Sequence, residues 1–355
     1  MAAADSPARP GAAAGGAGRS GRAGRWFASF WWRASPSPAA RLLQPLSWLY
    51  RALAAIARAA APAPAATPVP VLVVGNFVVG GAGKTPVVIA LVRALQAAGR
   101  RPGVISRGHG RAGAGVYEAG TDSPPQRSGD EPLLIRRRTG VPVFVGRRRA
   151  EAAAALCARH AQVDVLVSDD GLQHHALARV GEIVVFDDRG AGNGLLLPAG
   201  PLRQPLPRAL PRNAFVLYSG ERTSTPLPGM VVPRRRDAVV PLAAWARGEA
   251  AAAQPLASLR GRRVTALAGI GAPEQFFRML EAAGLDIERL PCADHADYPQ
   301  WPWPGRTREV VTTEKDAVKL ALLLPAPVPV WVLPLDCDLP PPLVSALLAL
   351  LPPVR

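Results

Sequence analysis

The segment "VLVVGNFVVGGAGKT" (residues 71–85) constrains the fold more than any other part of the chain. A short aliphatic run leads into a glycine-rich turn that ends in lysine and threonine, and a helical pattern follows. An aliphatic strand joined to a helix by such a turn is the repeating unit of a parallel sheet covered by helices. The segment therefore predicts an α/β fold with a phosphate-binding loop after its first strand.

The loop contains the groups that bind a nucleotide phosphate. Its glycines leave backbone N–H groups free to surround an anion at the N-terminus of the following helix. The lysine adds a positive charge, and the threonine hydroxyl is a ligand for Mg²⁺. The predicted nucleotide-binding residues are Gly80, Gly81, Ala82, Gly83, Lys84 and Thr85.

One position departs from the usual phosphate-loop pattern, G-x-x-x-x-G-K-[ST]. The first glycine of that pattern is replaced here by Val78. Because Gly80, Gly81 and Gly83 still flank the turn, we expect the loop to wrap a phosphate despite this change. The alternative is a glycine-rich turn between strand and helix that binds nothing.

Further aliphatic segments extend the predicted sheet. Continuous apolar strands that alternate with helices or loops indicate a parallel sheet with both faces covered. A Pro/Arg-rich stretch near residue 229 interrupts this alternation, which then resumes. We predict a phosphate-loop domain over residues 61–228 and a smaller α/β domain over residues 229–355 that closes the cleft. The predicted strands of the first domain lie within residues 69–76, 101–106, 141–146, 163–170, 181–188 and 213–220.

Polar residues follow several of these strands. Asp169 and Asp170 come directly after the aliphatic run "VDVLVS", where carboxylates face the ligand crevice of α/β sheets. Beside a phosphate loop they predict a metal site; by themselves they would be a turn. Arg107 and His109 follow another strand, and "SGDEP" (128–132) lies in a turn-rich loop, where solvated residues are the simpler interpretation.

The first 60 residues have a different character. Residues 1–24 contain Ala, Gly, Arg and Pro without periodicity, which predicts a disordered tail. Residues 25–60 predict a membrane-associated amphipathic helix, with arginines toward lipid phosphates and tryptophans at headgroup depth. Arg51 interrupts the apolar run too early for a bilayer span of roughly 20 residues. The alternative is a helix packed on its own domain. The apolar stripe consists of Leu42, Leu46, Leu49, Leu53 and Ile56.

The formal charge of +16 comes almost entirely from arginine, and Lys84, Lys315 and Lys319 are the only lysines. A lysine kept against this arginine bias indicates a place where the broader guanidinium fork does not fit. Motifs of nucleic-acid-binding modules are missing from the sequence, so we expect no nucleic-acid partner; an anionic membrane surface explains the charge as well. No protein partner is inferred. The odd number of widely spaced cysteines predicts no disulfide framework and a reducing compartment.

Seven segments in order resemble one family. They are "VVGNFVVGGAGKTP", "GVISRGHGR", "GDEPLLI", "VSDDGLQHHAL", "GNGLLLPAGPLRQP", "ADHADY" and "TTEKDAVKL". Together they resemble the tetraacyldisaccharide 4′-kinases of lipid A biosynthesis. The resemblance implies a peripheral enzyme on the cytoplasmic face of the bacterial inner membrane. With ATP and Mg²⁺, it would phosphorylate the 4′-hydroxyl of a tetraacylated glucosamine disaccharide 1-phosphate.

The resemblance also implies roles for individual residues. Asp130 would be the base at the sugar hydroxyl, and His295 would pair with it from the smaller domain. Lys84 would act on the transferred phosphate, while Thr85, Asp169 and Asp170 would hold the metal. The residues implied to lie near substrate or nucleotide phosphates are Arg107, His109, Gln173, His174 and Arg203.

Two positions depart from the family pattern. His109 replaces a usual tyrosine, and Gln204 replaces a usual glutamate, which removes a carboxylate. The main alternative is a membrane-recruited phosphate-loop ATPase of the partitioning type. That class has an additional lysine in its loop, at the position that Val79 holds here.

Overall fold

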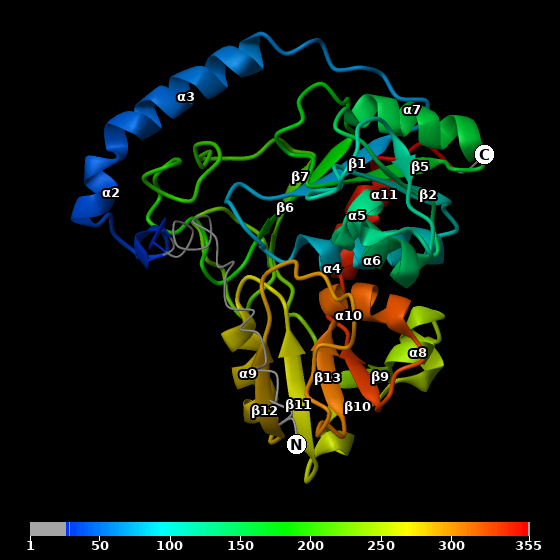
Figure 1. Ribbon diagram of the computed structural model, residues 1–355. Helices are drawn as coiled ribbons and strands as arrows, with labels where there is room; N and C mark the ends of the chain where they lie inside the picture. The colour runs from blue at the N-terminus through cyan, green and yellow to red at the C-terminus, as the bar shows by residue number, and fades with distance from the viewer. Residues whose placement is uncertain (1–25, 28, 354–355) are drawn as a thin grey trace, which may run out of the picture.

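The computed structural model describes residues 26–27 and 29–353 and contains two sheets (Figure 1). The first sheet has eight strands in the order β3-β4-β2-β5-β1-β6-β7-β8. The pairing of β3 with β4 is antiparallel and the other pairings are parallel, which confirms the predicted parallel α/β architecture. Its strands are β1 (Val71–Gly75), β2 (Pro102–Ser106), β3 (Tyr117–Glu118), β4 (Val143–Val145), β5 (Val165–Asp169), β6 (Gly181–Phe186), β7 (Ala214–Tyr218) and β8 (Met230–Val231).

Helices cover both faces of the first sheet, as the alternation of buried side chains along β1 shows. Leu72 and Val74 belong to the core cluster that includes side chains of α4, α6 and α11. Val71 and Val73 point to the opposite face, where α7 supplies the apolar cover. The helices of this part are α4 (Lys84–Ala97), α5 (Pro125–Ser128), α6 (Asp130–Thr139), α7 (Arg149–Arg159) and α11 (Pro341–Ala349).

The second sheet has six strands in the order β10-β9-β14-β13-β11-β12 and lies in the lower part of Figure 1. Its four strands β12, β11, β13 and β14 are parallel, whereas β9 and β10 add an antiparallel edge. Its elements are β9 (Ala238–Pro241), α8 (Leu242–Ala246), β10 (Gln254–Pro255), β11 (Arg263–Ala268), α9 (Pro273–Ala282), β12 (Asp286–Pro291), β13 (Val310–Thr313), α10 (Glu314–Leu320) and β14 (Val330–Leu333), with short 3-10 turns at Ala250–Ala252, Leu256–Leu259 and Ala321–Leu323.

The chain beyond residue 228 contributes to both sheets. Strand β8 pairs with β7 in the first sheet, and α11 packs against α4 after the last strand of the second sheet. One apolar cluster runs from the α4 and α6 side of the first sheet to Val310 and Val330 of the second. The two sheets therefore share a continuous core, and α6 faces α10 across it.

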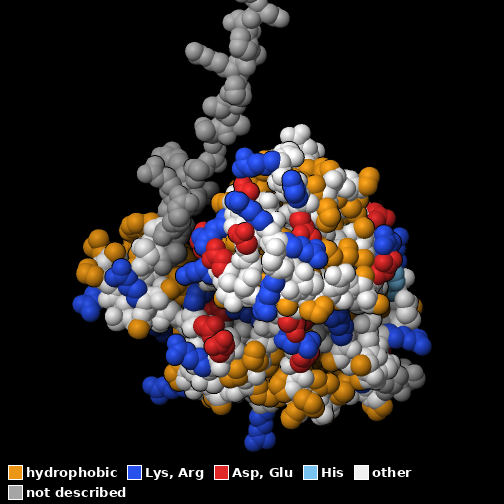
Figure 2. Space-filling model, turned by 90° about the horizontal axis from the view of Figure 1, so that it is seen from below, with side chains coloured by type: hydrophobic (Ala, Val, Ile, Leu, Met, Phe, Trp, Pro, Cys, Tyr) orange, Lys and Arg blue, Asp and Glu red, His pale blue; other side chains and the backbone are white. Residues whose placement is uncertain are grey.

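The N-terminal part extends away from the first sheet at the upper left of Figure 1. It contains α2 (Pro38–Leu42), which Ser37 caps, and α3 (Gln44–Ala59). None of the described helices is long and apolar enough to span a membrane. The leucines and isoleucine of the predicted stripe are exposed, and the lobe with α2 and α3 shows hydrophobic side chains beside basic ones at the left of Figure 2.

Helix α3 is nevertheless attached to the rest of the protein near its beginning. Ser47 Oγ donates a hydrogen bond to the carbonyl of Leu196 and accepts one from the N–H of Ala199. Tyr50 Oη donates to the carbonyl of Arg203 at 2.9 Å. These contacts hold the first turns of α3 against the segment 196–203, while its later turns stay exposed.

We predict that Arg138→Met destabilises the junction of the two sheets. The Arg138 side chain of α6 is 10% exposed and pairs with Glu314 of α10, which is 5% exposed. Removing one member leaves the other charge buried, which costs about 3–5 kcal/mol. The urea midpoint should fall clearly, whereas Arg306→Met, which removes a surface pair with Glu288, should leave it unchanged. Equal midpoints for the two variants would contradict the buried-pair interpretation.

Candidate functional site

The polar residues that follow the strands of the first sheet lie along one edge. Because β1, β2, β4 and β5 are parallel neighbours, their carboxyl ends meet there, where α/β proteins bind their ligands. The register pairs Val74 of β1 with Asp169 of β5. The phosphate loop therefore lies beside the acidic pair. Arg107 follows β2 and Arg149 follows β4 at the same edge.

The loop ends where α4 begins, and two of its glycines have a left-handed backbone. Gly80 has φ 93° and Gly83, the residue before α4, has φ 79°. A Cβ atom at Gly83 would lie 2.8 Å from Ser219 Oγ. Backbone conformation and space thus both require glycine at Gly83.

Val78 occupies a different environment from the glycine that it replaces. It is fully buried and forms an antiparallel bridge with Leu202, and the next N–H, of Val79, donates to the carbonyl of Pro201 at 2.9 Å. The chain is extended at this position and turns only afterwards. A buried aliphatic residue suits such a bridge, so the missing glycine does not disturb the loop.

Lys84 lies among groups that compensate its charge. Its Nζ donates to Asn76 Oδ1 at 3.1 Å and lies 3.3 Å from Asp170 Oδ1. Arg203 approaches the same carboxylate, at 3.3 Å from Oδ2. Burial opposes ionisation of Asp170, but Lys84 and Arg203 outweigh it and hold the pKa of this carboxyl below its usual value. Asp170 is therefore a carboxylate at neutral pH.

Asp169 is the residue best suited to a cation. Its side chain is buried, Ser106 Oγ donates to Oδ2 at 3.0 Å, and Oδ1 has no hydrogen-bond partner in the described part of the chain. Burial, followed by the charges of Glu131 and Asp170, raises its pKa to about 7. A nearby Mg²⁺ would satisfy Oδ1 and favour the ionised form. The residues that would hold Mg²⁺ are Thr85, Asp169 and Asp170.

No cluster of three or more acidic, histidine or cysteine ligands converges among the described residues. Mg²⁺ is usually bound by one or two carboxylates and completes its shell with water and substrate phosphates.

The amide of Gln173 links the acidic loop to the phosphate loop. Its Nε2 donates to the carbonyl of Asn76 at 3.0 Å and to Gln204 Oε1 at 3.3 Å, while its Oε1 accepts from Arg203. Gln204 thus contacts another amide. His174 points elsewhere: its Nε2 accepts the N–H of Arg149 at 3.3 Å.

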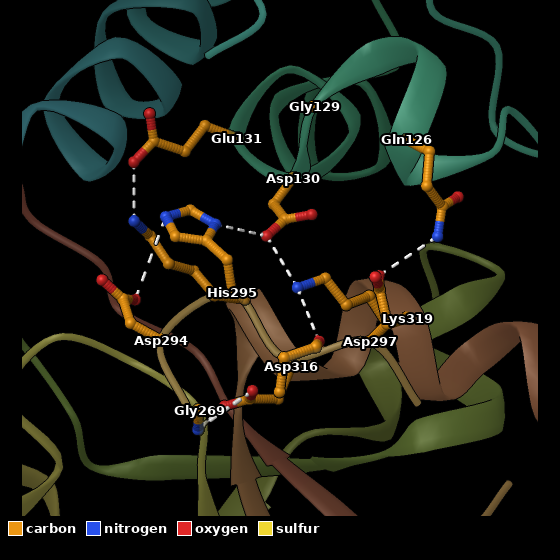
Figure 3. Close-up of polar contacts among 12 residues, drawn as sticks. Gln126, Gly129, Asp130, Glu131, Gly269, Asp294, His295, Asp297, Asp316 and Lys319 are labelled. Atoms are coloured by element: carbon orange, nitrogen blue, oxygen red, sulfur yellow. Dashed lines mark hydrogen bonds and ion pairs between the residues drawn. The ribbon is translucent and has the colours of Figure 1, made fainter. Parts of the chain in front are cut away.

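Asp130 and His295 are in contact although they lie 165 positions apart (Figure 3). Asp130 is the first residue of α6, and His295 follows β12 of the second sheet. The distance between His295 Nδ1 and Asp130 Oδ2 is 2.9 Å. Burial opposes ionisation of Asp130, yet hydrogen bonds from His295 and Lys319 hold its pKa below the usual value. The hydrogen bond to Asp130 in turn raises the pKa of His295.

Arg107 and His109 remain apart from these contacts. Both side chains are exposed, and neither forms a hydrogen bond within the described residues. They lie at the same edge of the sheet as the loop, because they follow β2. The structure therefore leaves them available to a ligand but joins them to no other site residue.

The structure adds residues that the sequence interpretation did not assign. Arg149 is buried, and its guanidinium donates to the carbonyls of Gly146 and Asp169. Arg189 donates to the carbonyl of Gly81 in the phosphate loop at 2.7 Å and lies over the ring of Trp32. Their positions in the sequence could have identified them, because Arg149 and Arg189 come a few residues after β4 and β6, at the edge of the sheet where ligands bind.

Three features define a phosphoryl-transfer enzyme: a phosphate loop with Lys-Thr, an adjacent acidic pair, and a carboxylate–histidine contact with a loop of the second sheet. The family model "Tetraacyldisaccharide-1-P 4'-kinase" (LpxK) matches residues 39–352, and the chain belongs to this family. This membership confirms the family resemblance and excludes the partitioning-ATPase alternative.

Relatives and a solved structure agree with this assignment. The chain is 52% identical to the tetraacyldisaccharide 4'-kinase of Leptothrix cholodnii, with 88% of this chain and 92% of that protein covered. It is 49% identical to the corresponding enzyme of Methylibium petroleiphilum, with 89% and 91% covered. The crystal structure of LpxK from Aquifex aeolicus in complex with ATP superposes with a TM-score of 0.72 at 25% identity, covering 88% of this chain and 99% of that one.

We predict that Asp130 and His295 act as one unit. Asp130→Ala and His295→Ala should each lower the rate at saturating ATP by about 10²–10⁴, the usual scale of acid–base catalysis. The double variant should be little worse than the more damaged single variant, because residues that act together are non-additive. ATP affinity, measured by equilibrium binding, should barely change. Losses that multiply in the double variant would show that the two act independently.

Proposed function

We propose that this protein is an ATP-dependent kinase that transfers the γ-phosphate of ATP to the 4′-hydroxyl of a tetraacyldisaccharide 1-phosphate, a step of lipid A biosynthesis. Family membership over residues 39–352 supports the reaction. The observation that carries the proposal is the contact between Asp130, the first residue of α6, and His295, from the loop after β12, which supports a carboxylate–histidine base. The enzyme names of the relatives agree with this reaction.

The phosphate loop binds the nucleotide in this proposal. Its N–H groups and Lys84 receive the phosphates of ATP at the N-terminus of α4. Lys84 contacts Asn76 and Asp170, so ATP would replace contacts that compensate the charge of this lysine. Mg²⁺ held by Thr85, Asp169 and Asp170 would neutralise charge on the phosphate oxygens.

Asp130 is the base for the acceptor. As the hydroxyl oxygen forms its bond to the γ-phosphorus, its proton passes to the carboxylate of Asp130, and the bond from phosphorus to the ADP oxygen breaks. His295 donates from Nδ1 to Asp130 Oδ2, which orients the carboxylate and stabilises its ionised form. The side chain of His295 is 54% exposed, so after the transfer the Asp130–His295 pair can release its additional proton to solvent.

The basic and polar residues at the sheet edge bind the remaining anionic groups. Arg107 and His109 are free in the described structure to meet the phosphate of the acceptor. Arg203 and Gln173 lie next to Asp170 and can turn toward the nucleotide. His174 supports this edge through its contact with Arg149.

The N-terminal helix connects the site to the membrane in our proposal. The exposed apolar stripe of α2 and α3 would lie in the interface on the cytoplasmic face of the bacterial inner membrane, with Arg51 and Arg58 toward lipid phosphates. Tyr50 of α3 contacts the carbonyl of Arg203, whose side chain pairs with Asp170. An acylated acceptor held in the membrane would therefore be presented directly beside the phosphate loop.

The function is tested with purified protein, labelled ATP, Mg²⁺ and tetraacyldisaccharide 1-phosphate. We expect a bis-phosphorylated lipid to form. Lys84→Ala should remove the transfer while leaving the fold intact, since this lysine neutralises phosphate charge and is not part of the apolar core. Arg148→Ala, at an exposed position, is the matched control and should keep wild-type turnover. Normal turnover in Lys84→Ala would disprove the assignment of the loop.

The membrane proposal is tested by removing the N-terminal part. Anionic liposomes should sediment the full chain, and a variant that begins at Pro68 should remain in the supernatant. Added salt should weaken sedimentation, because electrostatic attraction is screened over roughly 8–10 Å at physiological ionic strength. Equal sedimentation of the shortened variant would show that α3 is not the anchor.

A further inference from the structure

All three lysines of the chain lie at the site, and each pairs with an acidic residue. Lys84 pairs with Asp170, Lys315 with Glu131 and Lys319 with Asp130. The last two belong to α10 and lie one helical turn apart, so they share a face of that helix. They meet Asp130 and Glu131, the first two residues of α6; Figure 3 shows Lys319 against Asp130.

Lys319 is the more deeply placed of the two. Its side chain is 7% exposed, and its Nζ lies 2.9 Å from Asp130 Oδ2 and 2.9 Å from the carbonyl oxygen of Ala296. The oxygen that it contacts is the one that His295 Nδ1 also contacts. In the described part of the chain, no hydrogen bond reaches Asp130 Oδ1. Two donors therefore fix one oxygen of the carboxylate and leave the other for the acceptor.

The same helix also holds the loop that carries His295. Asp316 accepts the N–H of Gly269 with both carboxylate oxygens at 3.1 Å and the hydroxyl of Tyr298 at 2.7 Å. The N–H of His295 donates to the carbonyl of Gly269. Because Lys319 binds the carbonyl of Ala296 and Asp316 accepts from Tyr298, α10 holds this loop at two residues that follow the histidine.

We propose that Lys319 is a positioning residue for the phosphoryl transfer: together with His295 it locks Oδ2 of Asp130 so that Oδ1 faces the acceptor hydroxyl. The expected effect on the rate rests on the proposed kinase function. Its geometric basis is the buried ammonium of Lys319, which contacts both the carboxylate of Asp130 and the loop that carries His295. Lys319 does not touch the substrate itself in this arrangement.

The site explains why this residue is a lysine in a chain that otherwise uses arginine. Nζ has to meet one carboxylate oxygen and one carbonyl in a space with almost no solvent access. An ammonium is a compact point charge, whereas guanidinium is a planar fork with five donors. The larger group would displace either Asp130 or the carbonyl of Ala296.

The charged groups around Asp130 decide the direction of a pH effect. His295 and Lys319 contact Asp130 directly, and the charge of Lys315 acts on it from α10. Asp294 lies beside His295, Asp316 interacts with Lys319, and Glu131 follows Asp130 on α6. Removing the positive charge of Lys319 makes every ionisation of the Asp130–His295 pair occur at higher pH. Activity requires the Asp130 carboxylate, so the acid limb of the rate profile has to move upward.

The first experiment measures kinetics of Lys319→Met against pH. We expect kcat to fall on the order of 10–100-fold, the scale found when a residue that orients a metal ligand is removed, with the KM for ATP unchanged. The acid limb should move up by about one pH unit. A purely structural role would lower the activity equally at every pH. Arg306→Met, which removes an exposed charge from the segment between β12 and β13, should match the wild type in kcat, in KM for ATP and in the position of the acid limb.

Lys319→Arg is the second variant and guards against misfolding of the first. It keeps the charge but not the shape, so its acid limb should stay near that of the wild type while kcat is reduced. Wild-type kcat in this variant would overturn the claim that lysine geometry positions Asp130.

The second experiment needs no acceptor. The chain has five histidines, so the imidazole of His295 can be assigned in an NMR titration by comparison with His295→Ala. Lys319→Met should raise the pKa of His295, because a nearby positive charge is lost. If the wild type transfers no phosphate, the proposed function fails, yet this titration still tests the contact. An unchanged His295 titration together with an unchanged acid limb would overturn the proposal.

Discussion

The ion pairs between α6 and α10 are the constraint on which the site depends. Three successive contacts join the helices: Asp130 with Lys319, Glu131 with Lys315, and Arg138 with Glu314. Buried pairs contribute little net stability, since desolvation offsets their attraction, but a shifted register would leave several charges unpaired. These three ion pairs therefore select one arrangement of α6 relative to α10. In that arrangement the loop after β12 places His295 on Asp130.

The candidate site combines residues at the edge of a parallel sheet with residues from a helix start and a loop. The carboxyl edge of the parallel sheet brings together the phosphate loop and the acidic pair, because neighbouring parallel strands end at the same level. The proposed base comes instead from the start of α6 and from the loop after β12 of the other sheet. Burial shapes both: it raises the pKa of Asp169, whereas the paired cations keep Asp130 and Asp170 ionised. The same site thus contains one carboxyl group with a raised pKa and two with lowered pKa values.

The N-terminal segment is linked to the same edge by two short paths. Tyr50 of α3 holds the carbonyl of Arg203, and the ring of Trp32 lies under Arg189, which donates to the phosphate loop. Each path consists of one aromatic side chain and one arginine. The segment that we propose to lie on the membrane is therefore within two contacts of the groups that would bind ATP.

The sequence by itself determined the parallel α/β sheet, the phosphate loop after β1 and the acidic pair after β5, because aliphatic runs and glycine-rich turns are local signals. The Asp130–His295 pair was predictable only through family resemblance. The sequence could not assign Arg149, Arg189 or Lys319, or explain Val78, since each depends on a partner far along the chain. Only the tertiary structure decided these contacts: burial and the packing of α6 on α10 choose which charges meet, and no local pattern encodes that choice.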